Sequence, residues 1–139
     1  MAIREVIFRG KRTDNGKWEC GDLLSPNEFN AIPHIVYIAY LNEYGDIGEI
    51  STPVIPETVG QYTGLTDKNG VRIFEGDIIQ SLESSVTGLV QWFPEHSAFM
   101  VWCKSANEVG FLYECADIIK IIGNIHNNPE LLEGGEGNG

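Results

Sequence analysis

YTGLTDKNGVRIFEGDIIQSL, residues 62–82, contains three short runs of β-branched and aromatic residues separated by two turn signals. Asn69-Gly70 supplies the positive φ angles that a tight hairpin turn requires. Glu75-Gly76-Asp77 is a second turn, which leads into a further apolar run. The stretch therefore predicts antiparallel strands over residues 62–66, 71–74 and 78–82.

The same alternation of short apolar runs and turn signals extends toward both ends of the chain, and helical periodicity is nearly absent. This pattern is typical of an all-β sandwich or small barrel. Pro53 and Pro56 confine their segment to an irregular or edge position, because proline cannot donate a ladder hydrogen bond. The other predicted strands cover residues 3–9, 17–24, 34–41, 86–93, 98–103, 111–115 and 117–125.

One helix start is encoded near the C-terminus. Asn127 or Asn128 suits the N-cap, Pro129 suits the first helical position, and Glu130 lies at the positive end of the helix dipole. The pattern predicts a short C-terminal helix of a turn or two. Residues 133–139 contain no apolar side chain, so we expect them to be a disordered tail.

Taken together, these segments predict one all-β domain over residues 1–132. We expect a hairpin and meander of N-terminal strands (1–57), packed on a C-terminal SH3-like small barrel or sandwich (58–125) and followed by the short helix (126–132). Glu75-Gly76-Asp77, a tight turn that launches a core strand, is a device common in such barrels.

Charge and cysteine content restrict the partners and the compartment. The 139 residues include 9 Lys and Arg against 20 Asp and Glu, a formal charge of −11. Phosphate contacts need clustered basic residues, so neither direct nucleic-acid binding nor attraction to an anionic membrane is expected. Cys20, Cys103 and Cys115 are odd in number and widely spaced, unlike a secreted disulfide scaffold. With no signal peptide or membrane span recognised, we expect a reduced, cytoplasmic protein.

The middle of the chain has acidic residues but no basic ones. Between Trp18 and Asp67 there is no Lys or Arg, while eight Asp and Glu occur. Projected on one face of a sheet at spacings of about 7 Å, they would imitate a phosphate backbone and block a host DNA-binding protein. An ordinary solvated face is the other interpretation. The eight residues are Glu19, Asp22, Glu28, Glu43, Asp46, Glu49, Glu57 and Asp67.

The predicted hairpin of residues 86–93 and 98–103 has an unusual pattern. Its four-residue loop sets Phe93 opposite Ala98, which fixes the register, and both resulting faces are apolar. A hairpin with one wet face would alternate instead. Either both faces are buried between the N-terminal strands and the barrel core, or one face is an intermolecular surface. The candidate binding residues are Leu89, Phe93, Met100 and Trp102 on one face, with Glu57 and Gln61 on the barrel rim.

Three carboxylates near the two turns, Asp67, Glu75 and Asp77, are the candidate catalytic residues. With Lys68 or Arg72 near a phosphate, they would suit a divalent-metal-dependent nuclease. The structural interpretation competes, because Asp and Gly are favoured in turns for backbone reasons alone. The histidines lack metal-ligand spacing and no cofactor motif occurs, so neither a metal nor a cofactor is expected.

Three blocks of the sequence resemble the YopX family of phage and prophage proteins. They are Ile3–Arg9, Val54–Ile79 and Ile122–Leu132, which together span almost the whole chain up to Leu132. The resemblance implies an all-β fold, a phage or prophage origin and therefore the cytoplasm of a bacterial host. It implies no activity and assigns no catalytic residue.

We expect a phage or prophage accessory protein that binds another macromolecule without catalysis, through the hairpin of Trp92 and Trp102 or through the barrel rim. The expected partner is a protein of the host or the phage, and a homo-oligomer is left open. Two alternatives stand beside this hypothesis: an acidic DNA mimic, and a divalent-metal-dependent enzyme that uses Asp67, Glu75 and Asp77.

Overall fold

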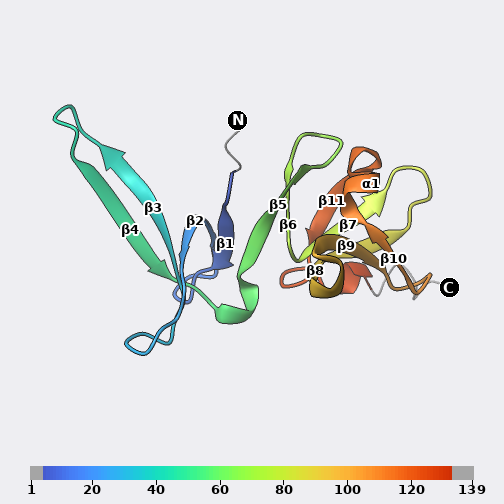
Figure 1. Cartoon of the computed structure of the whole chain (residues 1–139), viewed down its shortest axis with the longest axis horizontal. Coiled ribbons are helices and arrows are strands. Elements are labelled where there is room, and N and C mark those ends of the chain that lie inside the picture. Colours follow the sequence, from blue (N-terminus) through green and yellow to red (C-terminus); the bar gives the residue numbers. More distant parts are fainter. Residues whose placement is uncertain (1–4, 133–139) are drawn as a thin grey trace. The chain divides into compact units, whose positions relative to one another are not determined.

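The computed structural model describes residues 5–132, and the chain divides into two compact units between Gln61 and Tyr62. Antiparallel strands make up most of each unit, which confirms the all-β prediction (Figure 1). Among the described residues, no helix combines the length and the apolar character needed to cross a membrane. The predicted disordered tail lies outside the described residues, and the expectation of a single domain stays a prediction.

The first unit is a set of antiparallel strands in the spatial order β4-β3-β2-β1-β5. Asn15-Gly16 joins β1 to β2 as predicted, with Gly16 at φ +72° and Asn15 Oδ1 accepting the Lys17 N–H at 2.9 Å. As predicted for the segment with the prolines, β4, which ends at Pro53, lies at the edge of the sheet, and Pro56 lies in the short helical turn that follows. The elements are β1 (Phe8–Lys11), β2 (Trp18–Leu24), β3 (His34–Leu41), β4 (Ile47–Pro53), η1 (Pro56–Thr58) and the start of β5 (Gly60–Thr66).

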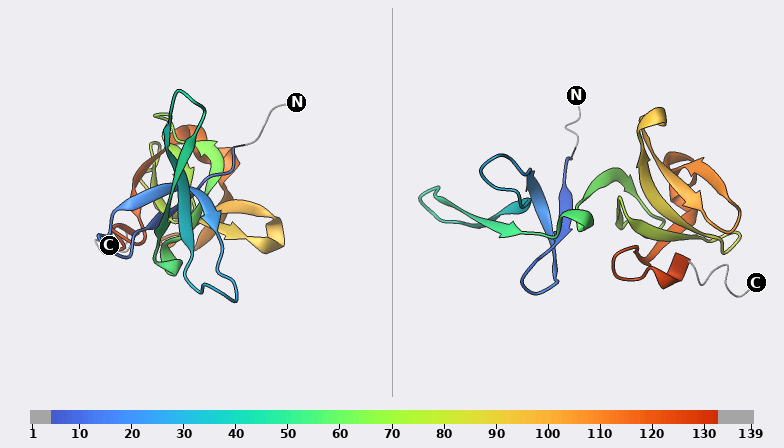
Figure 2. Two further views of the ribbon diagram at one scale, coloured as in Figure 1. Left: turned by 90° about the vertical axis from the view of Figure 1, so that its left-hand side faces the viewer. Right: turned by 90° about the horizontal axis from the view of Figure 1, so that it is seen from below.

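Only the inner part of β3 lies between two strands. β2 pairs with β3 through Asp22–Leu24 against His34–Val36, whereas β4 pairs with β3 as far as Leu41. Beyond Val36 the β3–β4 hairpin is therefore a two-stranded ribbon (Figure 2). β1 begins at Phe8 and not at Ile3; residues 5–7 are irregular, and Ile3 is outside the described part.

The core of the first unit joins β1, β3 and η1. Ile35 and Val54 are fully buried. Gly10 lies against Val54, where an added Cβ would come within 2.8 Å of a Val54 methyl group. Thr58 Oγ1 accepts the Lys11 N–H at 2.9 Å and donates to the Ile55 carbonyl at 2.6 Å, which fastens η1 to β1.

The second unit combines the β5–β6 hairpin with a five-stranded antiparallel sheet in the order β10-β9-β8-β7-β11. The sequence predicted a small barrel or a sandwich, and this sheet does not close into a barrel. Its two edge strands, β10 and β11, are not paired with each other, and a helical turn connects them. The elements are β6 (Arg72–Phe74), β7 (Asp77–Ser81), β8 (Thr87–Phe93), η2 (Pro94–His96), β9 (Ala98–Cys103), β10 (Glu108–Phe111), α1 (Leu112–Cys115), η3 (Ala116–Ile118) and β11 (Ile119–Asn124).

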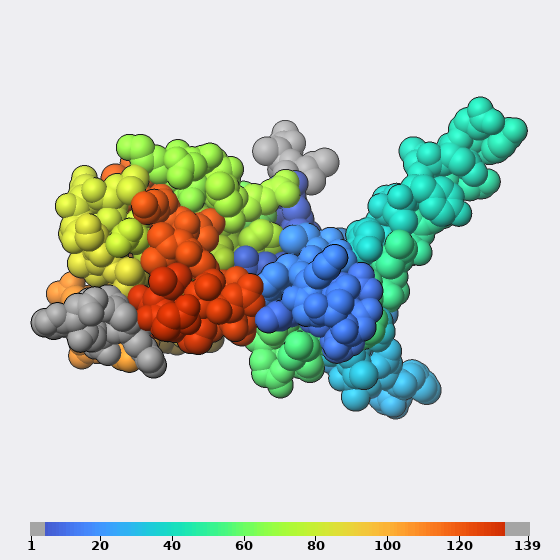
Figure 3. All heavy atoms as spheres, turned by 180° about the vertical axis from the view of Figure 1, so that it is seen from behind, coloured from blue at the N-terminus to red at the C-terminus, as the bar shows by residue number. Residues whose placement is uncertain are grey.

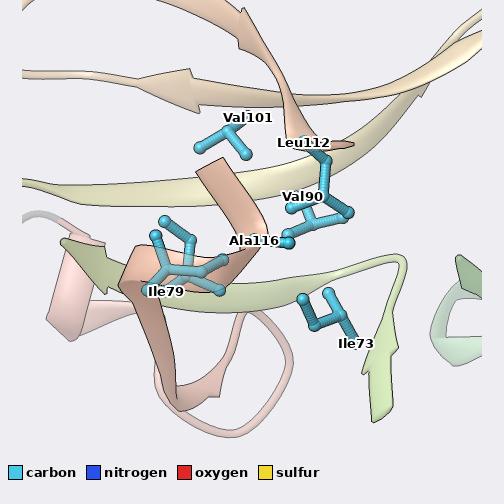
Figure 4. Packing of buried hydrophobic residues seen from close by; sticks show 7 residues of the cluster. Ile73, Ile79, Val90, Val101, Leu112 and Ala116 are labelled. Carbon is cyan, nitrogen blue, oxygen red and sulfur yellow. The ribbon is translucent and has the colours of Figure 1, made fainter. Parts of the chain in front are cut away.

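Helix α1 corrects the predicted strand over residues 111–115, because the strand ends at Phe111. Leu112 and Ala116 lie four residues apart, so a helical turn places both on one side, toward the core. There they join a buried cluster with Ile79, Val90 and other residues of the sheet (Figure 4). One helical turn is too short to show a helical period in the sequence.

The C-terminal segment confirms the predicted helix start. Residues 130–132 are helical; the Leu131 N–H donates to the Asn128 carbonyl at 3.0 Å, and the Leu132 N–H to the Pro129 carbonyl at 3.2 Å. Leu132 is buried with Ile78 and Leu89 in a second, smaller cluster. The short helix is therefore part of the packing of the second unit.

Candidate functional site

Asp67 is a buried carboxylate at the turn between β5 and β6. Its Oδ1 accepts the N–H groups of Asn69 and Val71, both at 2.9 Å, and its Oδ2 accepts the N–H of Ile121 at 3.1 Å. Both oxygens are thus engaged by backbone donors. The carboxylate holds the Asn-Gly turn together and connects it to β11, so its role in this fold is structural.

Asp77 serves a separate turn. It is 2% exposed, and its Oδ2 accepts the Phe74 N–H at 2.7 Å across a turn in which Gly76 has φ +93°. Glu75, half-buried in the same turn, lines a different hollow from the one of about 500 Å³ beside Asp67. Within residues 5–132 no group of three or more His, Cys, Asp or Glu side chains is arranged to hold a metal ion. The candidate catalytic carboxylates therefore do not form a metal centre.

The β8–β9 hairpin has the predicted register, with Phe93 opposite Ala98 and Leu89 opposite Trp102. Leu89 and Met100 are buried, at 7% and 3% exposure, while Phe93 and Trp102 are half-buried. Trp102 packs against the smaller cluster, as do Ile122, Ile125 and Leu131. The cover on this face thus comes from the C-terminal segment of the same unit. Glu57 and Gln61 belong to the first unit, the former exposed on η1 and the latter half-buried on β5.

A surface that the sequence did not indicate lies on the part of the β3–β4 hairpin that does not pair with β2. We call residues 38–50 the outer hairpin. Ile38, Leu41 and Tyr44 are 63%, 68% and 83% exposed. In the space-filling view the segment of the outer hairpin projects as a narrow arm (Figure 3). The run Ile35–Leu41 reads as a buried strand, and its periodicity does not reveal where the neighbouring strand stops. The other exposed large apolar side chains of the outer hairpin are Tyr40, Ile47 and Ile50.

The end turn of the outer hairpin is organised by Asn42. Its Oδ1 accepts the N–H groups of Tyr44 and Asp46 at 3.0 and 2.9 Å, and its Nδ2 donates to Asp46 Oδ2 at 3.1 Å. Gly45 adopts φ +86°, and its N–H donates to the Asn42 carbonyl at 3.1 Å. The turn is therefore fixed by its own side chains, and Tyr44 is presented on a defined backbone.

Strand register assigns the side chains of the outer hairpin to two faces. Ile38 pairs with Glu49 and Leu41 with Ile47, so these four share one face, which we call the Ile38 face. A bulge between Ile38 and Tyr40 shifts Tyr40 to the opposite face. There its ring lies so close to Gly48 that an added Cβ would overlap it. Gly48 therefore makes room for the tyrosine ring.

The acidic residues of the middle stretch do not share one environment. Asp67 is buried in the second unit, and Glu19 accepts a hydrogen bond from Arg12 at 3.3 Å. Arg12 also binds Asp14 at 2.7 Å, and this guanidinium lowers the pKa of Asp14. The remaining six acids are exposed in the first unit: Asp22, Glu28, Glu43, Asp46, Glu49 and Glu57.

The fold and these sites define an all-β protein of antiparallel hairpins in which buried carboxylates hold turns. The profile of the YopX protein family matches residues 7–133, so the chain belongs to the YopX family. It is similar to the crystal structure of protein EF1440 from Enterococcus faecalis, with a TM-score of 0.57 and 25% identity, over 92% of this chain and 98% of that chain. No curated protein matches the sequence.

Proposed function

We propose that this YopX-family member is a phage or prophage accessory protein, cytoplasmic in its bacterial host, that binds another protein through the outer hairpin without catalysis. The observation that supports the proposal is the set of six large apolar side chains exposed on the outer hairpin. Soluble proteins seldom expose large contiguous apolar patches unless these contact a partner or a ligand.

The shape of the outer hairpin suits recognition. Asn42 fixes the turn, so Tyr44 needs little ordering when a partner binds. Tyrosine is enriched at interfaces because it combines a large apolar ring with a polar tip. Tyr40 and Tyr44 therefore supply the side chains that most often anchor a protein interface.

The other candidate surfaces receive less support. Leu89 and Met100 on the β8–β9 hairpin are buried, and Trp102 is packed against the C-terminal segment. Catalysis by Asp67 is not proposed, because backbone N–H groups engage both of its oxygens. DNA mimicry is not proposed either, because Asp67 is buried and Glu19 is bound by Arg12, which removes two of its eight charges.

Site-specific photo-crosslinking tests the proposal. p-Benzoylphenylalanine placed at Tyr44 should yield a discrete protein adduct in bacterial cells that carry the phage gene set. The same probe at Tyr113, which is 65% exposed in the second unit, is the positional control. The Tyr44 adduct should disappear in the Ile38→Ser/Ile47→Ser variant. Equal adducts from both positions, or an adduct indifferent to the double substitution, would contradict binding through the outer hairpin.

A further inference from the structure

The outer hairpin has a pronounced charge as well as an apolar surface. Its residues include Glu43, Asp46 and Glu49, and no Lys or Arg occurs between Trp18 and Asp67. All basic residues of the first unit lie in its first 17 positions. The outer hairpin itself therefore presents acidic side chains and no Lys or Arg to any molecule that covers it.

The carboxylates lie beside the apolar strip on the Ile38 face. Glu49 pairs directly with Ile38 across the ribbon, and Leu41 and Ile47 are the next pair on the same face. At the inner end, Asp22 pairs with Val36, which in turn pairs with Ser51, so Asp22 extends the same face. Both Asp22 and Glu49 are exposed. The Ile38 face is thus an aliphatic strip bordered by carboxylates at two levels.

This arrangement selects among the possible occupants. A second copy of the chain would place like carboxylates against one another, and like-charge contacts oppose association. A nucleic acid or an anionic lipid surface would be repelled for the same reason. A segment with apolar side chains flanked by Lys and Arg satisfies both the strip and its border, because the ammonium and guanidinium groups would meet Glu49 and Asp22 at the rim.

We infer that the Ile38 face binds a cationic amphipathic segment of another protein, with apolar side chains on Ile38, Leu41 and Ile47 and basic groups on Glu49 and Asp22. This inference rests on the proposed function, because it names the chemistry of the partner that the outer hairpin takes. Asp46 is left out of the set, since its carboxylate already accepts the Asn42 amide within the turn.

Selection from a displayed library of random peptides on the full chain tests the inference. Peptides that also bind the Ile38→Ser/Ile47→Ser variant are removed first, so that only ligands of the Ile38 face remain. The retained peptides should carry apolar residues and an excess of Lys and Arg. Retained peptides that are neutral or acidic would overturn the inference while leaving the proposed function standing.

Charge removal then tests the border directly with the tightest retained peptide. Asp22→Asn/Glu49→Gln should weaken binding about tenfold, at roughly threefold for each exposed charge, and added salt should weaken wild-type binding similarly. The matched control is Glu95→Gln/Glu114→Gln, which removes the same charge from exposed positions of the second unit. Equal weakening by both pairs would reduce the effect to net charge and overturn the inference.

Two further outcomes bear on the proposed function as well as on the inference. If no peptide distinguishes wild type from the Ile38→Ser/Ile47→Ser variant and the Tyr44 crosslink is also absent, both fail together. If sedimentation velocity shows a wild-type dimer that the same double substitution dissociates, the occupant is a second copy and the cationic segment is wrong.

Discussion

Replacing Asp67 by Asn should destabilise the second unit by about 3 kcal/mol. Asp67 accepts three backbone hydrogen bonds, and bonds to a charged group contribute about 1.5–3 kcal/mol each. The amide of Asn has a single acceptor oxygen. If that oxygen keeps the turn bonds to Asn69 and Val71, the NH₂ group faces the Ile121 N–H, donor against donor. The part-buried Ile121 N–H then loses its acceptor, which costs about 1–3 kcal/mol.

Thermal unfolding measured by tryptophan fluorescence checks this prediction. A Trp18→Phe background removes the tryptophan of the first unit, so the signal comes from Trp92 and Trp102. A loss of 3 kcal/mol corresponds to a fall in Tm of roughly 12–24 °C for a unit of this size. Asp117→Asn, at an exposed position of the same unit, should change the free energy of unfolding by less than about 0.5 kcal/mol. If Asp67→Asn matches that control, the structural role assigned to this carboxylate is refuted.

Two further predictions concern packing and thiol reactivity. Gly88→Ala should lower the free energy of unfolding by about 1–3 kcal/mol, because the added Cβ would overlap a methyl group of buried Val101. Gly110→Ala, where the added Cβ meets open space, should leave it unchanged. Equal denaturation midpoints for the two variants would contradict the packing. Burial raises the pKa of Cys115, which lowers its thiolate fraction at a given pH, so iodoacetamide at pH 8 should alkylate exposed Cys20 about tenfold faster, as followed by mass spectrometry. The two rates should converge in guanidinium chloride; a persistent difference there would show that folding is not its cause.

The parts of the fold that could be predicted are those specified by neighbours in sequence. The loop Pro94–Ser97 fixed the register of β8 and β9, and Asn15-Gly16 fixed the first hairpin, because turn chemistry acts within a few residues. The C-terminal helix start was likewise local, since a cap and Pro129 suffice to specify it.

The sequence could not show which apolar side chains are covered, because this depends on where each neighbouring strand ends. β3 is apolar along its length, and burial at Ile35 but exposure at Leu41 follows only from the point where β2 stops pairing. The candidate binding site differs from the predicted one, the β8–β9 hairpin, for the same reason. Leu89 and Trp102 looked available because their cover, the segment that ends at Leu132, is distant in sequence. Hydrophobicity alone does not distinguish a covered face from a bare one.

Two of the three blocks that carry the family resemblance, the central and the C-terminal one, contact each other in the second unit. Asp67 from the central block accepts the Ile121 N–H, one residue before the C-terminal block begins, and the Ile125 N–H donates to the Gly76 carbonyl at 2.9 Å. Leu132 at the end of the C-terminal block is buried with Ile78 of the central one. The polar groups of these residues bind the backbone and their apolar groups lie in the core, so their role in this chain is to specify the fold. The exposed side chains of the outer hairpin lie outside all three blocks, and binding is therefore best sought there.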